Sequence, residues 1–322
     1  MGLLVPPPAH PAPFILFWKP NAAPATPSHM NISDDLRGTL YMCLSMMAFT
    51  VNDAFMKSVT QTLPLYQTIA LRGVIAVCGL GLIAAATGAL RIKLTRADVR
   101  LVAVRSFADV LATVFFLTAL LHMPLANLSA IMQAMPLAIT LGAALLYGDQ
   151  IGWRRMSAIL VGFAGVMIII RPGTEGFDRY ALLGVASMAC VVARDLAVRP
   201  LKSHVPSVTV ALGAAVGVTL MGLIGTLWGG WAAVSPGQGL SILGAGLFLI
   251  AGYLSAVTAM RWGEIGLVAP FRYTSLLWAI LLGWVAFSEL PDFWTLIGSG
   301  IVVAAGIFTL LRERALNRAL AA

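Results

Sequence analysis

The chain has 322 residues, of which 59% are hydrophobic and 11% are charged, and its mean hydropathy is +0.90. Because soluble proteins carry about 25% charged residues, this composition excludes an ordinary soluble enzyme and predicts a membrane protein. The formal net charge is +8. The basic residues are dispersed over short loops rather than gathered in one patch, which argues against nucleic-acid binding.

Residues 1–29 differ from the rest of the chain, because they hold eight of the 17 prolines and no apolar run long enough to span a bilayer. Two interpretations are open. The segment is a disordered tail, or it lies upstream of the true initiator, Met30. We predict a Pro-rich disordered tail over residues 1–35 and assign it no function.

From residue 36 onward the chain is a succession of apolar stretches of the length that a membrane-spanning helix needs, about 20 residues. The connections are too short to hold a soluble domain, so we predict an all-α integral membrane protein that is not an enzyme. Ten transmembrane helices are expected, followed by a cytoplasmic tail at 313–322: 36–57, 64–87, 98–121, 124–147, 153–170, 178–199, 206–229, 238–260, 264–287 and 292–311.

The segment from Asp53 to Lys57 recurs 142 positions later, from Asp195 to Arg199. The same offset relates three further pairs: Pro64 and Pro206, Ser45 and Ser187, and Met46 and Met188. Five spans, an odd number, separate the two copies, so the second copy starts on the opposite side of the bilayer. The pattern predicts two inverted five-helix repeats, 36–170 and 178–312, an architecture of many secondary transporters.

The distribution of basic residues predicts the orientation, because membrane proteins retain them mainly on the cytoplasmic side. If the N-terminus is cytoplasmic, 14 basic residues fall on the inside, and the three on the outside are Lys57, Arg171 and Arg179. We therefore predict that both termini are cytoplasmic.

The sequence lacks the usual signs of cofactor or metal chemistry. The three cysteines lie in separate spans and the four histidines are scattered. Neither a Gly-rich nucleotide-binding loop nor a His-Glu-x-x-His motif occurs. We expect no cofactor and no metal site.

Ionisable side chains at bilayer depth cost about 2.5–3.5 kcal/mol each on insertion scales, so they usually face a partner or a water-filled path. Three pairs have i,i+4 spacing, which places both side chains on one helical face. Either the pairs only neutralise themselves so that the helices can insert, or they take part in ion coupling. The pairs are Asp53/Lys57, Arg105/Asp109 and Asp195/Arg199.

Three arginines, Arg72, Arg194 and Arg272, have no such partner on their own helix if Asp195 pairs with Arg199. An arginine cannot lose its charge, so each must meet an acid on another helix, a carbonyl, water or a substrate anion. We assign Arg72 to the same coupling or ion-pair group as the i,i+4 pairs.

Arg272 lies among aromatic residues beside Pro270, and the corresponding span of the first half contains Pro136. Proline inside a span interrupts the helix, and interrupted helices at matching positions of two repeats indicate a midplane binding site. We therefore predict substrate contacts from six residues: Arg272, Arg194, Tyr273, Phe271, Trp278 and Gln133.

Five stretches resemble the EamA-type carriers of the drug/metabolite transporter superfamily: 52–57, 67–73, 126–131, 148–151 and 288–290. The resemblance covers about residues 36–312. The family usually has Glu where this chain has Asp149, whereas Glu289 keeps the pattern. The resemblance implies a multi-pass protein of the bacterial inner membrane. It also implies a central cavity lined by spans 1, 3, 4, 6, 8 and 9, which include Arg194 and Arg272.

Two classes of function are open. The first is secondary transport of a small organic metabolite by alternating access, driven by a proton gradient or by exchange. The second is a non-transporting membrane sensor or scaffold. Unpaired arginines and matching interrupted helices favour transport, because a scaffold has no need for them.

Basic residues outnumber acidic ones at bilayer depth, which favours a substrate with a carboxylate or another anionic group. The aromatic residues around Arg272 favour a planar ring, as in riboflavin, a nucleobase or S-adenosylmethionine. An amino-acid or metabolite exporter of the same fold is the alternative within transport. The expected partners are the lipid bilayer, a small-molecule substrate, and protons or a counter-substrate, but no nucleic acid.

Overall fold

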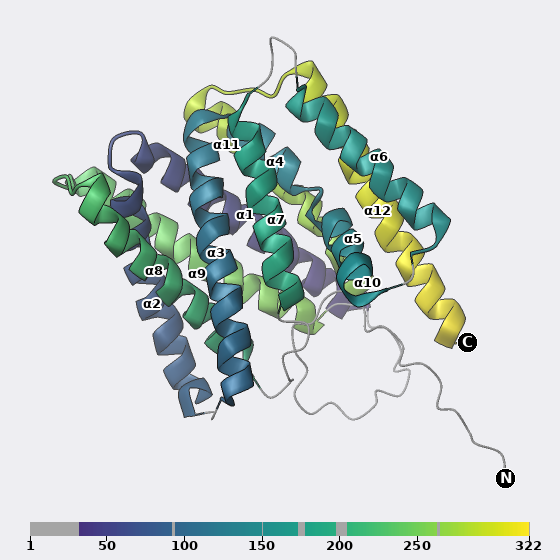
Figure 1. Cartoon of the computed structure of the whole chain (residues 1–322), viewed down its shortest axis with the longest axis horizontal. Coiled ribbons are helices and arrows are strands. Elements are labelled where there is room, and N and C mark those ends of the chain that lie inside the picture. Colours follow the sequence, from purple (N-terminus) through teal and green to yellow (C-terminus); the bar gives the residue numbers. More distant parts are fainter. Residues whose placement is uncertain are drawn as a thin grey trace.

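The computed structural model describes residues 32–91, 94–149, 151–172, 178–197, 205–262 and 265–321. Within these ranges the chain is helical and contains no β-strand (Figure 1). The α-helices (α) and 3-10 helices (η) are α1 (Ile32–Thr60), α2 (Leu65–Ala86), η1 (Ala89–Arg91), α3 (Arg96–His122), α4 (Leu125–Met132), α5 (Met135–Tyr147), α6 (Trp153–Ile170), α7 (Tyr180–Ala197), α8 (Ser207–Gly229), α9 (Pro236–Trp262), α10 (Ile265–Val268), η2 (Ala269–Tyr273), α11 (Thr274–Phe287) and α12 (Phe293–Ala321).

Eight helical segments of the described residues are long and apolar enough to cross a membrane, so the chain is a multi-pass membrane protein. They are Leu65–Ala86, Arg96–His122, Leu125–Tyr147, Trp153–Ile170, Ser207–Gly229, Pro236–Ala259, Ala269–Phe287 and Phe293–Arg312. Helices α1 and α7 lie outside this set. These two helices carry the charged residues Asp53, Lys57, Arg194 and Asp195 along their length.

Two of the predicted spans are interrupted, as their internal prolines led us to expect. The span at 124–147 divides into α4 and α5 around a turn at Gln133 and Ala134, and the span at 264–287 divides into α10, η2 and α11. Each break falls before the proline rather than at it: Pro136 lies in the first turn of α5, and Pro270 lies in the first turn of η2. Proline is tolerated there, since the first N–H groups of a helix have no acceptor within it.

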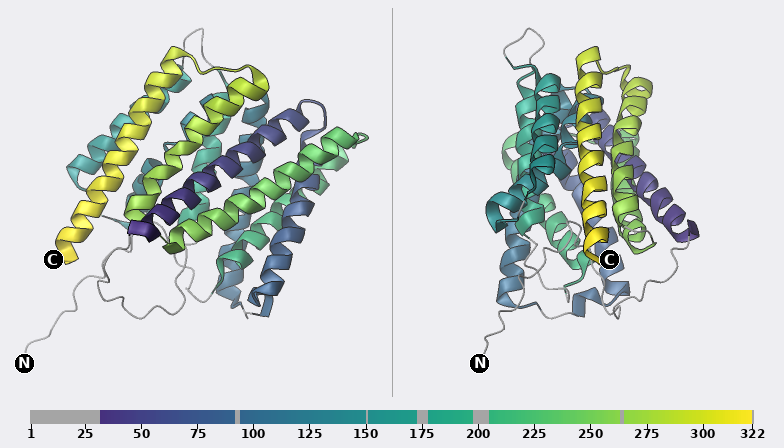
Figure 2. Two further views of the ribbon diagram at one scale, coloured as in Figure 1. Left: turned by 180° about the vertical axis from the view of Figure 1, so that it is seen from behind. Right: turned by 90° about the vertical axis from the view of Figure 1, so that its right-hand side faces the viewer.

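Helices from the two halves of the chain pack against each other in pairs. Helix α2 packs on α8 at one edge of the bundle and α6 packs on α12 at the other, while α1 lies on α9 and α3 lies on α7 between them (Figures 1 and 2). The α6–α12 contact is close: a Cβ added at Gly298 would lie 2.6 Å from the carbonyl oxygen of Gly165. Small residues at such a crossing let the two backbones approach.

One hydrogen bond between helices occurs at matching positions of the two halves. The Ser45 hydroxyl of α1 donates to the carbonyl of Gly252 in α9, at 2.8 Å, and the Ser187 hydroxyl of α7 donates to the carbonyl of Ala112 in α3, at 2.9 Å. Both serines are buried. The α1–α9 and α3–α7 contacts are therefore built in the same way, with the two halves exchanged.

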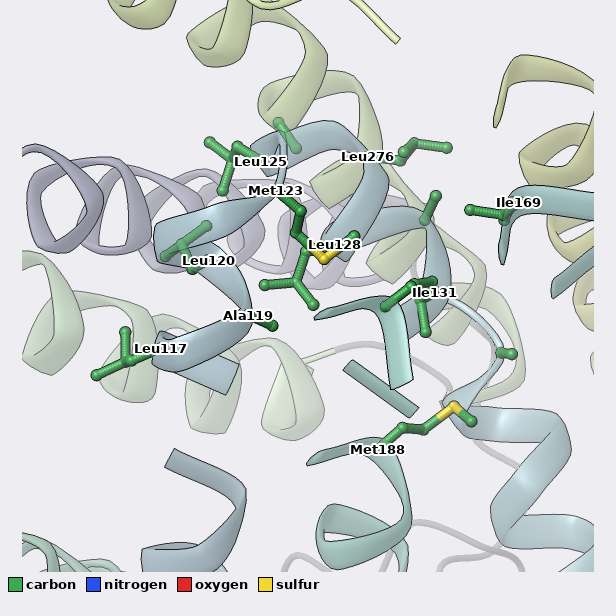
Figure 3. Close-up of a cluster of buried hydrophobic side chains, with 14 of the residues drawn as sticks. Leu117, Ala119, Leu120, Met123, Leu125, Leu128, Ile131, Ile169, Met188 and Leu276 are labelled. Carbon is green, nitrogen blue, oxygen red and sulfur yellow. The ribbon is translucent and has the colours of Figure 1, made fainter. Parts of the chain in front are cut away.

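The largest group of buried apolar side chains lies where α3, α4, α6, α7 and α11 meet (Figure 3). Figure 3 shows Leu120, Leu128, Ile131, Met188 and Leu276 around this point. In lipid the hydrophobic effect does not drive helices together, so close packing and interhelical hydrogen bonds must hold these segments. Leu82, Leu145 and Leu227 are highly exposed, which suits a lipid-facing surface.

Two predicted boundaries differ from the structure. Helix α1 begins at Ile32, so residues 32–35 are helical rather than part of the tail. Its first turn carries Asp34 and Asp35, whose negative charges favour a helix N-terminus. Helix α12 runs on to Ala321, so most of the predicted C-terminal tail continues the last helix. The remaining residues assigned to the N-terminal tail, including Met30, lie outside the described ranges.

Candidate functional site

The charged groups of α3 and α7 form one network in the interior. The Arg194 guanidinium donates from Nη1 to Asp109 Oδ1 at 2.6 Å and from Nε to Asp195 Oδ1 at 2.9 Å. The Arg105 Nη1 atom lies 3.4 Å from Asp109 Oδ2, so the predicted i,i+4 pair is confirmed. Two arginines and two aspartates make the network neutral.

This network corrects one expectation, because Arg194 is not an unpartnered cation. It binds an acid on its own helix and a second acid on α3. The predicted partner of Asp195 was Arg199, which lies outside the described residues. The adjacent Arg194 supplies the counter-ion that the i,i+4 spacing assigned to Arg199.

The predicted Asp53–Lys57 pair is wrong. The Lys57 ammonium, 3% exposed, lies 2.6 Å from both carboxylate oxygens of Glu289 and donates to the Met123 carbonyl at 3.0 Å. It also lies 5.1 Å from the ring centre of Phe287. The helical spacing places Lys57 and Asp53 on one face, but a carboxylate from the loop after α11 reaches the ammonium instead.

Glu289 is a residue that the sequence analysis singled out only as a family motif. Its Oε2 also accepts a hydrogen bond from the backbone N–H of Leu125, at 3.3 Å, at the first residue of α4. One ion pair therefore ties the end of α1 to the start of α4 and the end of α11. Glu289 and Lys57 are separated by 232 positions. Helical spacing within one span therefore could not predict that they form an ion pair.

Asp53 and Arg72 lie on either side of one amide. The Asn52 side chain donates to Asp53 Oδ1 at 2.9 Å, and its oxygen lies 3.4 Å from Arg72 Nη1. Arg72 is buried, and its Nε has no hydrogen-bond partner. Asp53 and Arg72 interact electrostatically, but no ion pair joins them within 4 Å in the part of the chain that the structure describes.

The two interrupted helices meet. The Gln133 amide, at the break between α4 and α5, donates to the Ser275 hydroxyl at 2.9 Å and to the Tyr273 carbonyl at 3.3 Å. Ser275 lies 142 positions after Gln133, so the repeat offset makes Ser275 the counterpart of Gln133 in the second half. The predicted residues Gln133 and Tyr273 are therefore brought together.

Tyr273 is buried, and its hydroxyl has no hydrogen-bond partner. The hydroxyl lies against Gly306 of α12, where an added Cβ would be 1.7 Å from it. Glycine at this position therefore makes room for the ring. A buried phenol oxygen without a partner is costly.

Arg272, like Arg72, makes no ion pair within 4 Å among the described residues. Asp195 and Arg194 both act on it electrostatically, the first favourably and the second unfavourably. Its side chain is partly exposed. Since the α3–α7 network is neutral by itself, Arg272 adds an uncompensated positive charge beside it.

The aromatic residues predicted to line the site do not form one group. Phe271 is exposed, and Trp278 packs against Met42, Met46 and their buried neighbours instead. Within the described ranges, no ring contact joins these side chains to Tyr273. The same ranges contain no cluster of side chains suited to a metal ion.

A sequence profile of the EamA-like transporter family matches residues 36–171 and again residues 178–311. The chain therefore belongs to the EamA-like transporter family. The two matches cover nearly all of the described helices and divide the chain at the segment between α6 and α7.

Characterised relatives are metabolite transporters. The pseudopaline exporter CntI of Pseudomonas aeruginosa is 26% identical over 84% of this chain and 94% of its own length. The riboflavin transporter of Rhizobium johnstonii is 30% identical over 59% of this chain and 63% of its own length. The S-adenosylmethionine uptake transporter of Rickettsia bellii is 25% identical over 59% of this chain and 65% of its own length.

A solved crystal structure has the same fold. It superposes with a TM-score of 0.60 at 22% sequence identity, over 86% of this chain and 98% of the solved chain. At this level of identity the likeness concerns the arrangement of helices alone.

Proposed function

We propose that the chain is a secondary transporter that moves a small organic metabolite across the bacterial inner membrane by alternating access. The observation that carries this proposal is the meeting of the two interrupted helices, where Gln133 bonds to Ser275 and to the Tyr273 carbonyl. Interrupted helices at the interface of two repeats are where transporters of this kind bind substrate. Arg272 lies directly beside Tyr273, so the uncompensated cation belongs to the same place.

Two inverted five-helix repeats are part of this proposal. Helix α7 is the counterpart of α1, and α3 is the counterpart of α9. The α1–α9 contact therefore corresponds to the α7–α3 contact, and the Ser45 hydrogen bond corresponds to that of Ser187. Such a pair of halves can rock around a shared site. The excess of basic residues on one side of the predicted topology supports cytoplasmic termini, which reporter fusions at residue 314 would test.

The substrate is proposed to carry a carboxylate or another anionic group, because Arg272 lacks an acid of its own. Arginine holds a carboxylate through two parallel N–H donors in a plane. A planar ring is the second proposed feature, since aromatic residues flank Arg272 on both sides in the sequence, Phe271 and Tyr273. The names of the relatives provide two probes, riboflavin and S-adenosylmethionine.

The experiment is uptake of labelled riboflavin and S-adenosylmethionine into proteoliposomes, preceded by a thermal-shift screen of a metabolite library to widen the set of probes. A ligand that binds only the folded protein raises its apparent stability. Arg272→Lys keeps the charge but loses the planar fork, so it should lower apparent affinity about tenfold or more, or about 1.4 kcal/mol, without loss of folded protein. An Arg272→Leu variant that transports with unchanged affinity would overturn the substrate contact.

A further inference from the structure

Asp53 is a carboxylate in α1 with no counter-ion of its own. Lys57, one turn further along, is bound to Glu289. Among the described residues, no basic group lies within ion-pair distance of Asp53, and its side-chain hydrogen bond comes from the neutral amide of Asn52, at 2.9 Å. A carboxylate at bilayer depth is costly unless it is paired, protonated or in contact with water.

Arg72 is the complementary group, a buried cation without a carboxylate. Its one side-chain hydrogen bond, to Asn52 Oδ1, is long at 3.4 Å, and its Nε has no partner. Asn52 therefore separates a cation and an anion that would otherwise pair. A movement that brought the two charged groups within 4 Å would replace the amide bridge with a direct ion pair.

The other helices packed against α1 bring no second counter-ion to Asp53. On α9, Tyr253 packs its ring against Phe49 and interacts electrostatically with Arg72, and on α3, Arg105 and Asp109 are engaged with each other and with α7. On η2, Arg272 interacts electrostatically with Asp195 and Arg194 of α7, and the Tyr273 hydroxyl lies against Gly306 of α12. The described residues of α10 and α11 carry no charged group. Of all these groups, Arg72 is the one that acts electrostatically on Asp53.

The matching aspartate of the second half has the opposite arrangement. Asp195 accepts a hydrogen bond of the same length, 2.9 Å, from the residue before it, but that residue is Arg194 rather than asparagine. Asp195 therefore keeps a permanent counter-ion. Position 72 corresponds to Ala214 in the second half. Only in the first half, therefore, is a cation, Arg72, separated from the aspartate by the side chain of an intervening residue, Asn52.

We infer that Asp53 is a proton-binding site of the transport cycle, where a proton and the Arg72 guanidinium compete for one carboxylate. The inference rests on the proposed function. The carboxylate takes a proton from water on one side of the membrane and becomes a neutral acid that still accepts from Asn52. When the proton leaves to the other side, the carboxylate pairs with Arg72, and the two states differ by one charge in α1.

The first test needs no substrate. Infrared spectra of the purified protein are recorded as a function of pH, and the C=O stretching band of a protonated carboxyl group is followed. Asp53→Asn should remove a band that appears as the pH is lowered, whereas the matched control Asp292→Asn, at an exposed position just before α12, should leave it in place. An unchanged band in Asp53→Asn would overturn the inference.

The second test uses proteoliposomes with labelled riboflavin and S-adenosylmethionine as probes. A gradient of one pH unit can drive about tenfold accumulation for each coupled proton. In Asp53→Asn this ratio should fall to about one while exchange of labelled for unlabelled probe continues. Accumulation equal to wild type would overturn the inference. If the wild-type protein moves neither probe, the proposed function fails for such substrates, and the infrared titration still decides the proton site.

Discussion

Asp53 of α1 and Asp195 of α7 occupy matching positions of the two halves, and each accepts a hydrogen bond of 2.9 Å from the residue before it. In the first half the donor is the neutral amide of Asn52, and in the second half it is the guanidinium of Arg194. The two aspartates share the position and length of this hydrogen bond, but the donor is neutral in the first half and positively charged in the second. The comparison teaches that a repeat conserves the positions of polar groups in space while each half is free to assign them different chemistry.

The interrupted helices show the same division. The break of the first half presents the neutral Gln133, and the break of the second half presents Arg272. The second half therefore holds Asp195 with a permanent counter-ion and leaves Arg272 without an ion pair among the described residues. The first half holds an acid that is free to exchange a proton.

The largest expected effect concerns Lys57. Asp53 differs from Asp195 only if Lys57 is bound to Glu289 and does not neutralise Asp53. Glu289→Gln should destabilise the protein by about 3–5 kcal/mol, since it leaves a buried ammonium without its carboxylate. Adding Lys57→Met should recover much of the loss. Thermal unfolding in detergent of the two single variants and the double variant gives the coupling. The same cycle on Lys57 and Asp53 should be additive, and strong coupling there would restore the pair expected from the helical spacing.

The second prediction removes the permanent counter-ion of Asp195 in the second half. Arg194→Asn gives the second half the neutral donor of the first, and it should cost about 3 kcal/mol, the upper end for hydrogen bonds to a charged group. Asp195→Asn added to it should reduce the loss, because the uncompensated carboxylate is removed with its partner. The measurement is the midpoint of thermal unfolding together with the yield of monodisperse protein. Equal and additive losses would show that Arg194 and Asp195 act independently.

The third prediction sharpens the comparison by rebuilding the second half within the first. The double variant Asn52→Arg/Arg72→Ala keeps the net charge and copies the arrangement of Arg194, Asp195 and Ala214. It should fold with a loss of about 1–3 kcal/mol, within the usual range for single-site changes, but lose the infrared band that titrates with pH. Retention of that band would mean that a permanent neighbouring cation does not prevent protonation of Asp53.

The smallest effect is expected at the partly exposed ion pair between Arg171, which follows α6, and Asp292, which precedes α12. Partial burial opposes the charge of Asp292, but hydrogen bonding from Thr295 and the Arg171 guanidinium outweigh it and hold the pKa of Asp292 below its usual value. Since the folded-state pKa is the lower one, the contribution to stability is present above the unfolded pKa and is lost as the pH falls through the folded one. Thermal unfolding of Asp292→Asn should therefore show a weaker loss of stability on acidification than wild type. Parallel curves would contradict the ion pair with Arg171.

Local properties of the sequence determined the helical architecture. Apolar runs of about 20 residues are helical because a bilayer leaves no other way to satisfy the backbone of a single segment. Pro136 and Pro270 marked the interrupted helices, since proline removes a donor from the ladder. The Arg105/Asp109 pair was predictable as well, because the two groups lie one helical turn apart on the same face.

Only the tertiary structure decided which charges meet across helices. Lys57 pairs with Glu289, Arg194 reaches Asp109, and Gln133 bonds to Ser275, over separations of 232, 85 and 142 positions. Helical spacing shows which side chains share a face, but long side chains choose among all groups on the packed neighbours. In a membrane protein the faces toward lipid and toward protein are both apolar, so the sequence pattern alone does not tell which helices will be neighbours.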